Sequence, residues 1–365
     1  MSGFFIRQIN DIRDDGVFVL FKKVYKFLLV VMAIPIVIII RLLAPFVLLR
    51  FGRIPCSRIG SFSTLPELYL CERNLSINNR TFDFFCCNGK VANYQLKKMW
   101  ERALYISDFV DPVLFANKLL PGYKKHTVII HNNNESDYRG LLATSSVNIS
   151  FTEEEKRYAQ ETLQMRGIPL NSKFVCFSSR DSVYLNTIIP KNDWSYHDYR
   201  DFSIYNCVSA VKELSKKGYF VFRMGAATKE VLDTDNPKII DYTNRFRDGF
   251  LDIYLLGNCY FFLGSHSGIN SVPMIFRRPR AVVNVIPISD VHTWMPDDLF
   301  IPKKLWLEKE HRFMTFREIF ESGVSRFLRT ELYDQLGIEV VNNTSEEITA
   351  LAVEMDERLK GIWKT

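Results

Sequence analysis

The chain has 365 residues, of which 47% are hydrophobic and 24% charged, and its formal net charge is +6. This balance is typical of a globular protein of about two domains and excludes an intrinsically disordered chain. The positive charge is modest and spread along the sequence, and no nucleic-acid-binding motif is present. It therefore suits anionic ligands or lipid headgroups and argues against nucleic acid as a partner.

The seven cysteines are scattered, odd in number and without a Cys-x-x-Cys pair: Cys56, Cys71, Cys86, Cys87, Cys176, Cys207 and Cys259. This pattern argues against both a zinc site and a disulfide framework. A reducing compartment is the simpler expectation.

The first predicted element is an apolar run from Phe27 to Leu49 with Arg41 as its only charged residue. As a helix it is long enough to cross a hydrocarbon core of about 30 Å. Basic residues flank both ends, so the positive-inside rule gives no orientation. Because Pro35, Pro45 and a costly arginine interrupt the run, a bent re-entrant or monotopic segment is favoured over a straight span. Residues 1–53 are therefore assigned to a membrane-associated helical segment.

Residues 54–150 are predicted to form an N-terminal α/β domain. Its predicted strands are Leu68–Cys71, Phe82–Cys87 and Thr127–Ile130, and its predicted helix is Tyr94–Leu104.

Residues 151–343 alternate between strands and helices and are predicted to form a C-terminal Rossmann-like domain. A helix at Thr152–Arg166 begins with a capping box formed by Thr152 and Glu155. Predicted strands follow at 174–177, 219–224, 239–242, 260–263 and 281–286, and helices at 202–217 and 251–258. Residues 344–365 form a last helix, which we expect to pack back across the domains.

A Gly-Ser-His-Ser-Gly turn joins the predicted strand at 260–263 to an apolar helix. Small residues let backbone N–H groups approach a ligand, and the first turn of a helix offers unpaired donors and a positive dipole end. We predict that the turn binds the diphosphate of a nucleotide-sugar donor through Gly264, Ser265, His266, Ser267 and Gly268. The alternative is an ordinary strand-to-helix turn.

Polar side chains also follow the other predicted strands, where ligands bind in a parallel sheet. Arg180 and Asp181 follow the first strand, Arg223 follows the second, and Asp241 and Tyr242 follow the third. Because guanidinium groups bind phosphate oxygens, Arg180 and Arg223 are predicted to hold the diphosphate. Asp181 is predicted to orient Arg180, and Asp241 and Tyr242 are candidates for donor binding. The alternative for Arg180 and Asp181 is a local ion pair.

A long polar loop from Tyr184 to Asp201 carries aromatic and charged residues. A histidine beside an aspartate can act as a general base, so His197 and Asp198 are predicted to deprotonate an acceptor hydroxyl. Aromatic faces suit sugar rings, and the predicted acceptor-binding residues are Trp194, Tyr196, Tyr199 and Arg200. The alternative is that His197 packs or caps within an ordered loop.

No metal site is predicted. Asp233-Thr-Asp235 is an Asp-x-Asp pair of the kind that can hold a divalent cation, but no apolar strand leads into it. Solvated loop carboxylates are therefore the favoured interpretation.

The motifs together resemble a family of glycosyltransferases encoded in bacterial surface-polysaccharide loci. The resemblance covers about Ile39 to Gly361 and rests on the segments Arg53–Ser61, Val175–Tyr184, Tyr196–Asp201, Gly218–Gly225, Ile240–Tyr242, Phe262–Gly268, Pro302–Lys304 and Glu354–Met355. The arginine-aspartate motif and the serine-rich turn are more distantly similar to fucosyltransferase-like enzymes of the GT-B fold. Ser178 stands where members of the first family place a histidine, so no histidine role is carried to it.

The resemblance implies a GT-B-like protein with two Rossmann-like domains facing a cleft. It implies that residues 54–150 form the acceptor-side domain and residues 151–343 the nucleotide-sugar domain. The implied activity is transfer of a hexosyl or deoxyhexosyl group from a nucleotide-diphosphate donor to a lipid-linked or other glycan acceptor. No cofactor is expected, and the catalytic domain is expected on the cytoplasmic face of the inner membrane, in contact with membrane lipids. The alternatives are a lumenal Golgi-type glycosyltransferase and a non-catalytic membrane-attached nucleotide- or sugar-binding protein.

Overall fold

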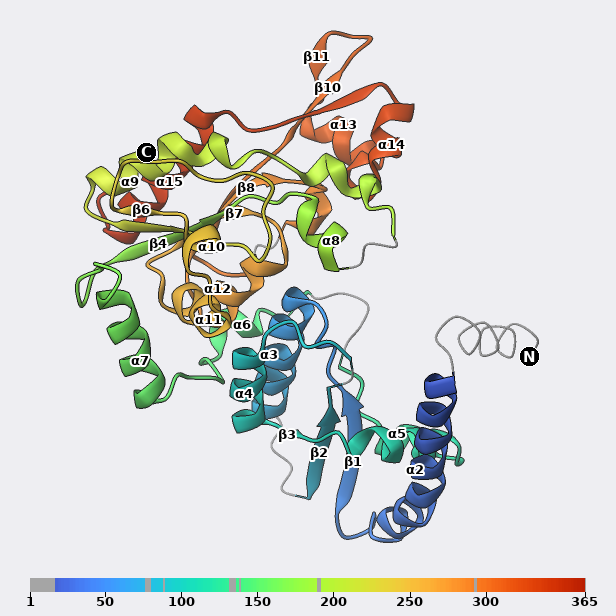
Figure 1. Ribbon diagram of the computed structural model, residues 1–365. Coiled ribbons are helices and arrows are strands. Elements are labelled where there is room, and N and C mark those ends of the chain that lie inside the picture. Colours follow the sequence, from blue (N-terminus) through green and yellow to red (C-terminus); the bar gives the residue numbers. More distant parts are fainter. Residues whose placement is uncertain are drawn as a thin grey trace.

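The computed structural model describes residues 17–75, 80–87, 89–130, 136–137, 139–188, 192–291 and 294–364. The N-terminal half is built around a three-stranded sheet and the C-terminal half around a six-stranded sheet, and the halves pack against each other (Figure 1). A cavity lined by both halves lies between them. The predicted α/β class, with two halves facing a cleft in the GT-B-like manner, is confirmed.

The apolar run forms α2 (Val17–Leu42), which continues through Pro35 as one helix. Residues 23–42 have a mean hydropathy of 2.4 and are long enough to cross a membrane. After a turn at residues 43–46 the chain enters the N-terminal sheet as β1 (Leu48–Arg53). Residues 48–53 are therefore part of the sheet and not of the membrane-associated helical segment predicted for residues 1–53. Residues 1–16 of that segment lie outside the described residues.

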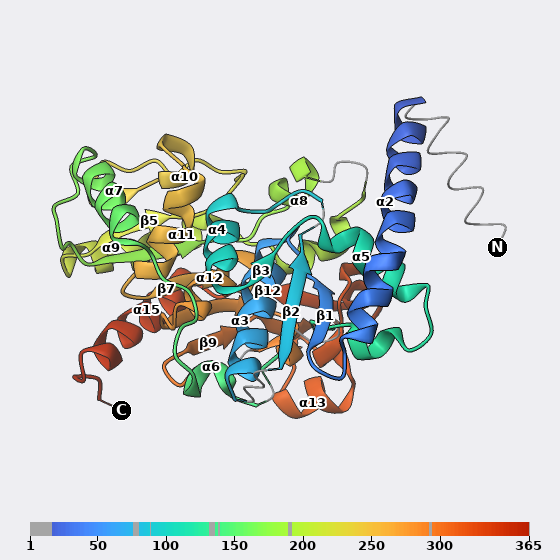
Figure 2. The same ribbon diagram turned by 90° about the horizontal axis from the view of Figure 1, so that it is seen from below.

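Helix α2 packs on α5 (Val110–Lys118) (Figure 2), and Arg41 near the end of α2 is hydrogen-bonded to the C-terminal end of α5. Its Nη2 donates to Asn117 Oδ1 (2.7 Å) and Asn117 O (3.1 Å), and its Nη1 donates to Pro121 O. A positive charge is favoured beside the carbonyl groups that end a helix. The protein itself therefore supplies acceptors for both terminal nitrogens of the arginine that interrupts the apolar run.

The N-terminal sheet has the parallel order β1-β2-β3. Its predicted strand at Phe82–Cys87 and helix at Tyr94–Leu104 are confirmed as β2 and α4. The remaining elements of this half are α3 (Ile59–Leu75), β2 (Thr81–Cys86), α4 (Tyr94–Ala103), β3 (Tyr105–Ile106), η1 (Tyr123–His126) and α6 (Leu141–Thr144).

Two predicted strands of this half are wrong. Leu68–Cys71 belongs to α3, where Phe62, Pro66 and Leu70 are buried at helical spacing. A four-residue apolar run is too short to separate a strand from a helix. Thr127–Ile130 makes only an isolated bridge, from Thr127 to Phe51.

The C-terminal sheet is parallel throughout, in the order β6-β5-β4-β7-β8-β9. Each strand predicted for this half is present, with shifts of a few residues at the ends. The elements are α7 (Glu153–Gln164), β4 (Phe174–Ser178), α8 (Val183–Ile188), η2 (Ser195–Arg200), η3 (Ile204–Cys207), α9 (Val208–Lys216), β5 (Phe220–Arg223), β6 (Ile239–Ile240), α10 (Tyr242–Arg245), α11 (Gly249–Asn258), β7 (Phe262–Ser265), η4 (Gly268–Asn270), α12 (Ser271–Ile275), β8 (Arg280–Val285), η5 (Ile288–Asp290) and β9 (Leu299–Pro302).

A small antiparallel sheet of order β11-β10-β12, which was not predicted, extends the C-terminal half. It consists of β10 (Lys304–Leu307), β11 (Arg312–Phe313) and β12 (Ile338–Val341), and it is accompanied by α13 (Phe316–Glu321), η6 (Val324–Arg326) and α14 (Thr330–Gln335).

The last helix, α15 (Ser345–Leu359), begins with a capping box of Thr344 and Glu347. Ile348, Ala352 and Met355 pack into a core made by α9 and strands of the six-stranded sheet. The main contacts of α15 therefore lie within the C-terminal half, and the prediction that it packs back across the domains is wrong.

The two halves share one hydrophobic core. Phe62 and Trp100 from the N-terminal half lie in the same cluster as Leu256 and Val272 from the C-terminal half. At this contact a Cβ on Gly60 would lie 3.1 Å from the Cα of Gly268, so the backbones of α3 and η4 touch. This shared core fixes the position of one wall of the cleft against the other.

Candidate active site

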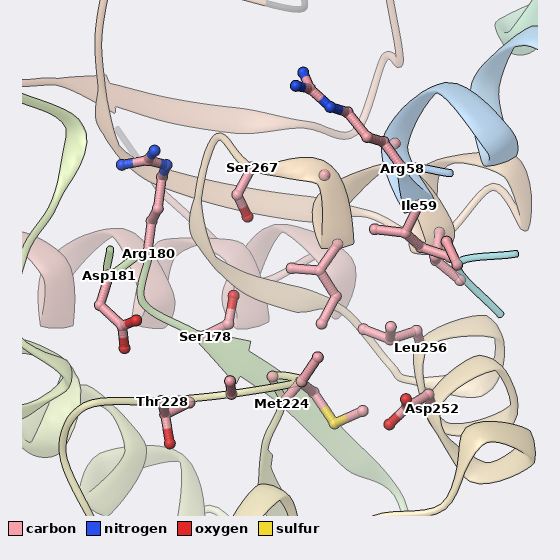
Figure 3. A pocket seen from close by; sticks show the side chains of 18 of the residues that line it. Arg58, Ile59, Ser178, Arg180, Asp181, Met224, Thr228, Asp252, Leu256 and Ser267 are labelled. Carbon is pink, nitrogen blue, oxygen red and sulfur yellow. The ribbon is translucent and has the colours of Figure 1, made fainter. Parts of the chain in front are cut away.

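A cavity of about 280 Å³ lies between the halves, at the carboxyl ends of β4, β5 and β7. This edge of the sheet is where ligands bind in parallel α/β proteins. In Figure 3, Ser267 lies between Arg180 and Arg58, with Met224 and Leu256 lower in the view. Both halves contribute side chains, so a ligand bound here contacts both.

Arg180, directly beyond β4, lines the cavity as predicted. Its Nη1 donates to the Asp201 carboxylate and to His197 O (3.2 Å). The prediction that Asp181 orients Arg180 is wrong: the Asp181 carboxylate accepts from the backbone N–H groups of Val183 and Lys229, both at 3.0 Å. Asp201 holds the guanidinium instead, from the far end of the loop.

The imidazole of His197 also lines the cavity, and its Nδ1 is buried with no hydrogen-bond partner among the described residues. Burial, and then the positive charges of Arg180, Arg200 and Arg58, lower the pKa of His197 to about 4. The ring is therefore neutral at neutral pH and can accept a proton.

Asp198 does not accompany His197. It is exposed and lines a separate surface depression formed with α14 and β12. Adjacent residues of the 3₁₀ helix η2 point in different directions, so adjacency in sequence does not place the carboxylate against the imidazole. The prediction that His197 and Asp198 act together at one site is therefore not supported by their positions.

Two of the four predicted acceptor-binding residues, Trp194 and Arg200, line the cavity. Arg200 Nη2 donates to His266 O (2.8 Å), which ties the loop to the Gly264–Gly268 turn. Tyr196 packs on the His197 ring at 4.0 Å between centroids and does not line the cavity. Tyr199 is buried against Tyr333, in a separate core, so its predicted acceptor contact is wrong.

The predicted donor residues Arg223, Asp241 and Tyr242 are all buried and do not line the cavity. Arg223 pairs with Asp241 at 3.3 Å and donates to Glu230 O at 2.5 Å. Tyr242 donates to Asp248 O at 2.7 Å. These partners lie inside the C-terminal half, so the prediction that the three residues contact the donor directly is wrong.

The turn after β7 is divided between the cavity and the protein interior. Ser267 and Gly268 line the cavity. Gly264 and Ser265 are part of buried β7, where a Cβ on Gly264 would lie 2.5 Å from Ser178 O. The side chain of His266 lines a different depression. The predicted donor contact therefore has a place at Ser267 and Gly268 and is wrong for the other three residues.

Several cavity residues were not predicted as site residues. Arg58, Ile59, Gly60, Ala92 and Asn93 come from the N-terminal half; Met224, Gly225, Ala226, Ala227 and Thr228 follow β5; Arg247, Asp252, Ile253 and Leu256 belong to α11 and the loop before it. The available signal was the family resemblance, because its segments Arg53–Ser61 and Gly218–Gly225 include Arg58, Ile59, Gly60, Met224 and Gly225.

Lys303, which was also not predicted as a site residue, supports the cavity wall from a buried position. Its buried Nζ donates to Tyr199 O (2.8 Å) and Asp201 O (2.9 Å), so it holds the turn that carries Asp201. Burial lowers the pKa of Lys303 to about 7 and raises the pKa of Asp201 to about 6.

The charge on the cavity lining is positive. Among the described residues Asp181 and Asp252 are its carboxylates, and both are engaged, the first with backbone N–H groups and the second with Arg247 at 2.6 Å. Arg58, Arg180 and Arg200 remain; Asp201 is paired with Arg180, and Asp290 lies near enough to Arg200 to act on its charge. This arrangement suits an anion with several oxygen atoms.

The described residues contain no group of three or more His, Cys, Asp or Glu side chains that could hold a metal ion. Asp233 and Asp235 are exposed in the loop between β5 and β6 and do not line the cavity.

No family model and no curated protein matches the sequence. Among solved structures, the chain is similar to a glycosyl transferase family 9 protein from Veillonella parvula DSM 2008, with 10% identity, a TM-score of 0.48, and 85% of this chain and 97% of that chain covered. It is also similar to the ADP-heptose lps heptosyltransferase II of E. coli, with 13% identity, a TM-score of 0.39, and coverages of 84% and 100%. These values describe a distant overall likeness and identify no substrate.

Proposed function

We propose that the chain is a glycosyltransferase that moves a hexosyl or deoxyhexosyl group from a nucleotide-diphosphate donor to a glycan acceptor, without a divalent cation. The observation that carries this proposal is the convergence of Arg58, Arg180 and Arg200 on one cavity between the two halves. A diphosphate leaving group needs its developing negative charge neutralised, and arginine side chains supply that neutralisation where no metal is bound.

In the proposed reaction the acceptor hydroxyl oxygen bonds to the anomeric carbon of the donor sugar. The bond from that carbon to the diphosphate oxygen breaks, and its electron pair leaves with the nucleoside diphosphate. His197, whose imidazole lines the cavity, takes the hydroxyl proton on its ring. Because nearby arginines help to lower the pKa of His197, a bound diphosphate that offsets their charge raises that pKa and makes the imidazole a stronger base.

We further propose that the acceptor is lipid-linked and that the protein works on the cytoplasmic face of a membrane. The exposed apolar helix α2 supports this part of the proposal. An acceptor confined to the same surface as the enzyme has a higher effective concentration there.

A nucleotide panel tests donor binding. GDP, UDP, CMP and ADP are added separately, with EDTA, and the thermal midpoint of the protein is measured. We expect one nucleotide to raise the midpoint, because a ligand that binds the folded state stabilises it. The Arg180→Gln variant should lose this rise, while Arg157→Ala, which changes an exposed arginine on α7, should keep it. Stabilisation by none of the nucleotides would overturn the proposal.

A pair of adjacent substitutions tests catalysis separately. His197→Gln should keep nucleotide binding and lose transfer by roughly 10²- to 10⁴-fold, the usual contribution of a general base. Asp198→Asn should retain transfer, because Asp198 faces a different surface. The non-catalytic alternative is favoured because no carboxylate among the described residues is hydrogen-bonded to Nδ1 of His197. Nucleotide binding without any transfer or donor hydrolysis would support it.

A further inference from the structure

Helices α2 and α5 pack together at the edge of the N-terminal half, away from the cleft (Figure 2). Ala33 and Val37 of α2 are buried with Ala116 of α5, and Val30, Ile34, Val113 and Leu120 pack around them. Met32 and Ile39, elsewhere on the same helix, are 69% and 58% exposed. The C-terminal half of α2 is therefore bound to protein on one side and apolar on its exposed surface.

This packing is incompatible with α2 crossing a bilayer on its own. The stretch from Val17 to Leu29, before the contact with α5 begins, is about 20 Å long at 1.5 Å per residue, whereas the hydrocarbon core is about 30 Å thick. That stretch also contains three lysines, at positions 22, 23 and 26. A spanning helix would have to leave α5 or carry it into the hydrocarbon.

The polar groups at the contact make either outcome costly. Arg41 donates to Asn117 Oδ1 at 2.7 Å, and Asp111 at the start of α5 is paired with Arg53 at 2.6 Å. Moving α5 into lipid would remove these charged groups from water, and separating it from α2 would leave the Arg41 contacts broken.

Apolar side chains are exposed on the α5 segment as well as on α2. Phe115 and Leu119, which are four residues apart and so share a face of the helix, are 50% and 67% exposed. Lys118, Lys124 and Lys125 are exposed in the segment that Arg41 binds through Asn117 and Pro121. Lysines therefore accompany both ends of the apolar helix, which suits a helix with both ends at one layer of anionic headgroups.

We infer that α2 and α5 together form an in-plane docking surface for a bilayer that contains anionic lipids, with both ends of α2 on the same side of the membrane. A second copy of the chain fits less well, because pairing two such surfaces brings the lysines of one copy near those of the other. The inference deepens the proposed function and depends on its membrane association, but it does not depend on the transfer reaction.

Flotation of the full chain with vesicles tests the surface. We expect binding to vesicles of phosphatidylcholine and phosphatidylglycerol, with weaker binding to pure phosphatidylcholine and at high salt. Phe115→Glu with Leu119→Glu should reduce the bound fraction severalfold. The matched control is Phe316→Glu with Phe320→Glu, another exposed pair four residues apart, on α13. Equal binding by both double variants, or vesicle-independent dimerisation lost only in the α5 variant, would overturn the inference.

Labelling from one side of sealed vesicles tests the topology. The native cysteines of the described residues are all buried, so background labelling of the folded protein should be low. Cysteines introduced by Lys26→Cys and Lys124→Cys should both react with an impermeant maleimide added outside. Protection of one site until the vesicles are opened would show a spanning helix and overturn the inference. Nucleotide binding is measured on the same samples, so failure of the docking surface is distinguished from failure of the donor site.

Discussion

The ends of β4 and β5 look alike in sequence but serve different purposes in the structure. The two strands are parallel neighbours. Arg180 follows β4 and is paired with Asp201, whereas Arg223 ends β5 and is paired with Asp241. Arg180 lines the cavity, whereas Arg223 is 1% exposed and does not. Position at a strand end therefore does not by itself identify a ligand-binding arginine.

The loops that follow the two strands cause the difference. After β5 the chain folds back over the arginine, so that Glu230 O accepts from Arg223 and the N–H of Leu232 donates to Asp241 at 2.9 Å. After β4 the long loop returns beside Arg180 and leaves its guanidinium at the cavity wall. One pair is enclosed by its loop, and the other is held open to a ligand.

The largest expected effect is loss of stability at the β5 end. Asp241→Ala leaves the buried Arg223 charge without its partner, which costs roughly 3–5 kcal/mol in comparable buried pairs. The free energy of unfolding is measured by urea denaturation. The exposed-loop change Asp233→Ala is the control and should cost less than about 0.5 kcal/mol. Equal costs for the two variants would contradict the enclosed-pair interpretation of Arg223.

The next effect is loss of nucleotide affinity at the β4 end. A double change, Arg180→Met with Asp201→Asn, removes the arginine without leaving an unpaired carboxylate. Hydrogen bonds to charged groups contribute about 1.5–3 kcal/mol, so affinity for the stabilising nucleotide should fall roughly 10- to 150-fold. Calorimetric titration measures it. Unchanged affinity in a folded double variant would place the diphosphate elsewhere.

The sequence predicted the strands of the C-terminal half well because each is a short apolar run closed by turn residues, as at Phe174–Ser178. It also predicted Arg180, His197, Ser267 and Gly268, which all line the cavity. It could not separate them from Arg223 and Asp241, because the path of the following loop decides which strand-end side chain is enclosed. Nor could it find the Asp201 partner of Arg180, since that ion pair spans a loop of more than a dozen residues.

The N-terminal wall of the cleft was predicted less well. Arg58 reaches the cavity because α3 begins against η4, where Gly60 meets Gly268 across the interface. Such a contact depends on how the two halves pack together, and no local pattern reports it. The same limit applies to Arg41, whose partners at Asn117 and Pro121 are distant in sequence.

A smaller effect is expected in the pH dependence of stability. Burial raises the pKa of Asp201 to about 6 in the folded protein, so folding favours its protonated form. Stability from this group is then present below about pH 4 and is lost as pH rises through about 6. Asp201→Asn should remove roughly 1 kcal/mol of this change, a value reduced because the side chain remains partly exposed. Urea unfolding at pH 4 and pH 7 measures it.

The Asp252→Asn variant is a control for the pH dependence of stability measured with Asp201→Asn. Burial raises the pKa of Asp252 to about 6 as well, so Asp252→Asn should show a change of the same sign. The double variant should show the sum of both changes, because the two carboxylates have different partners, Arg180 and Arg247. A single variant that already removes the whole pH dependence would contradict the assignment of separate roles.

The smallest effect concerns Asp181, which joins the two regions. Its carboxylate accepts from Val183 N beyond β4 and from Lys229 N in the loop beyond β5, and that loop supplies Gly225 and Thr228 to the cavity wall. Asp181→Asn keeps one acceptor oxygen, so we expect loss of about 0.5–1 kcal/mol of nucleotide binding, a two- to fivefold weaker affinity. Stability should change little. If Asp181 instead oriented Arg180 directly, its substitution would approach the much larger loss expected for the Arg180 double variant, and titration of the two proteins under the same conditions separates these outcomes.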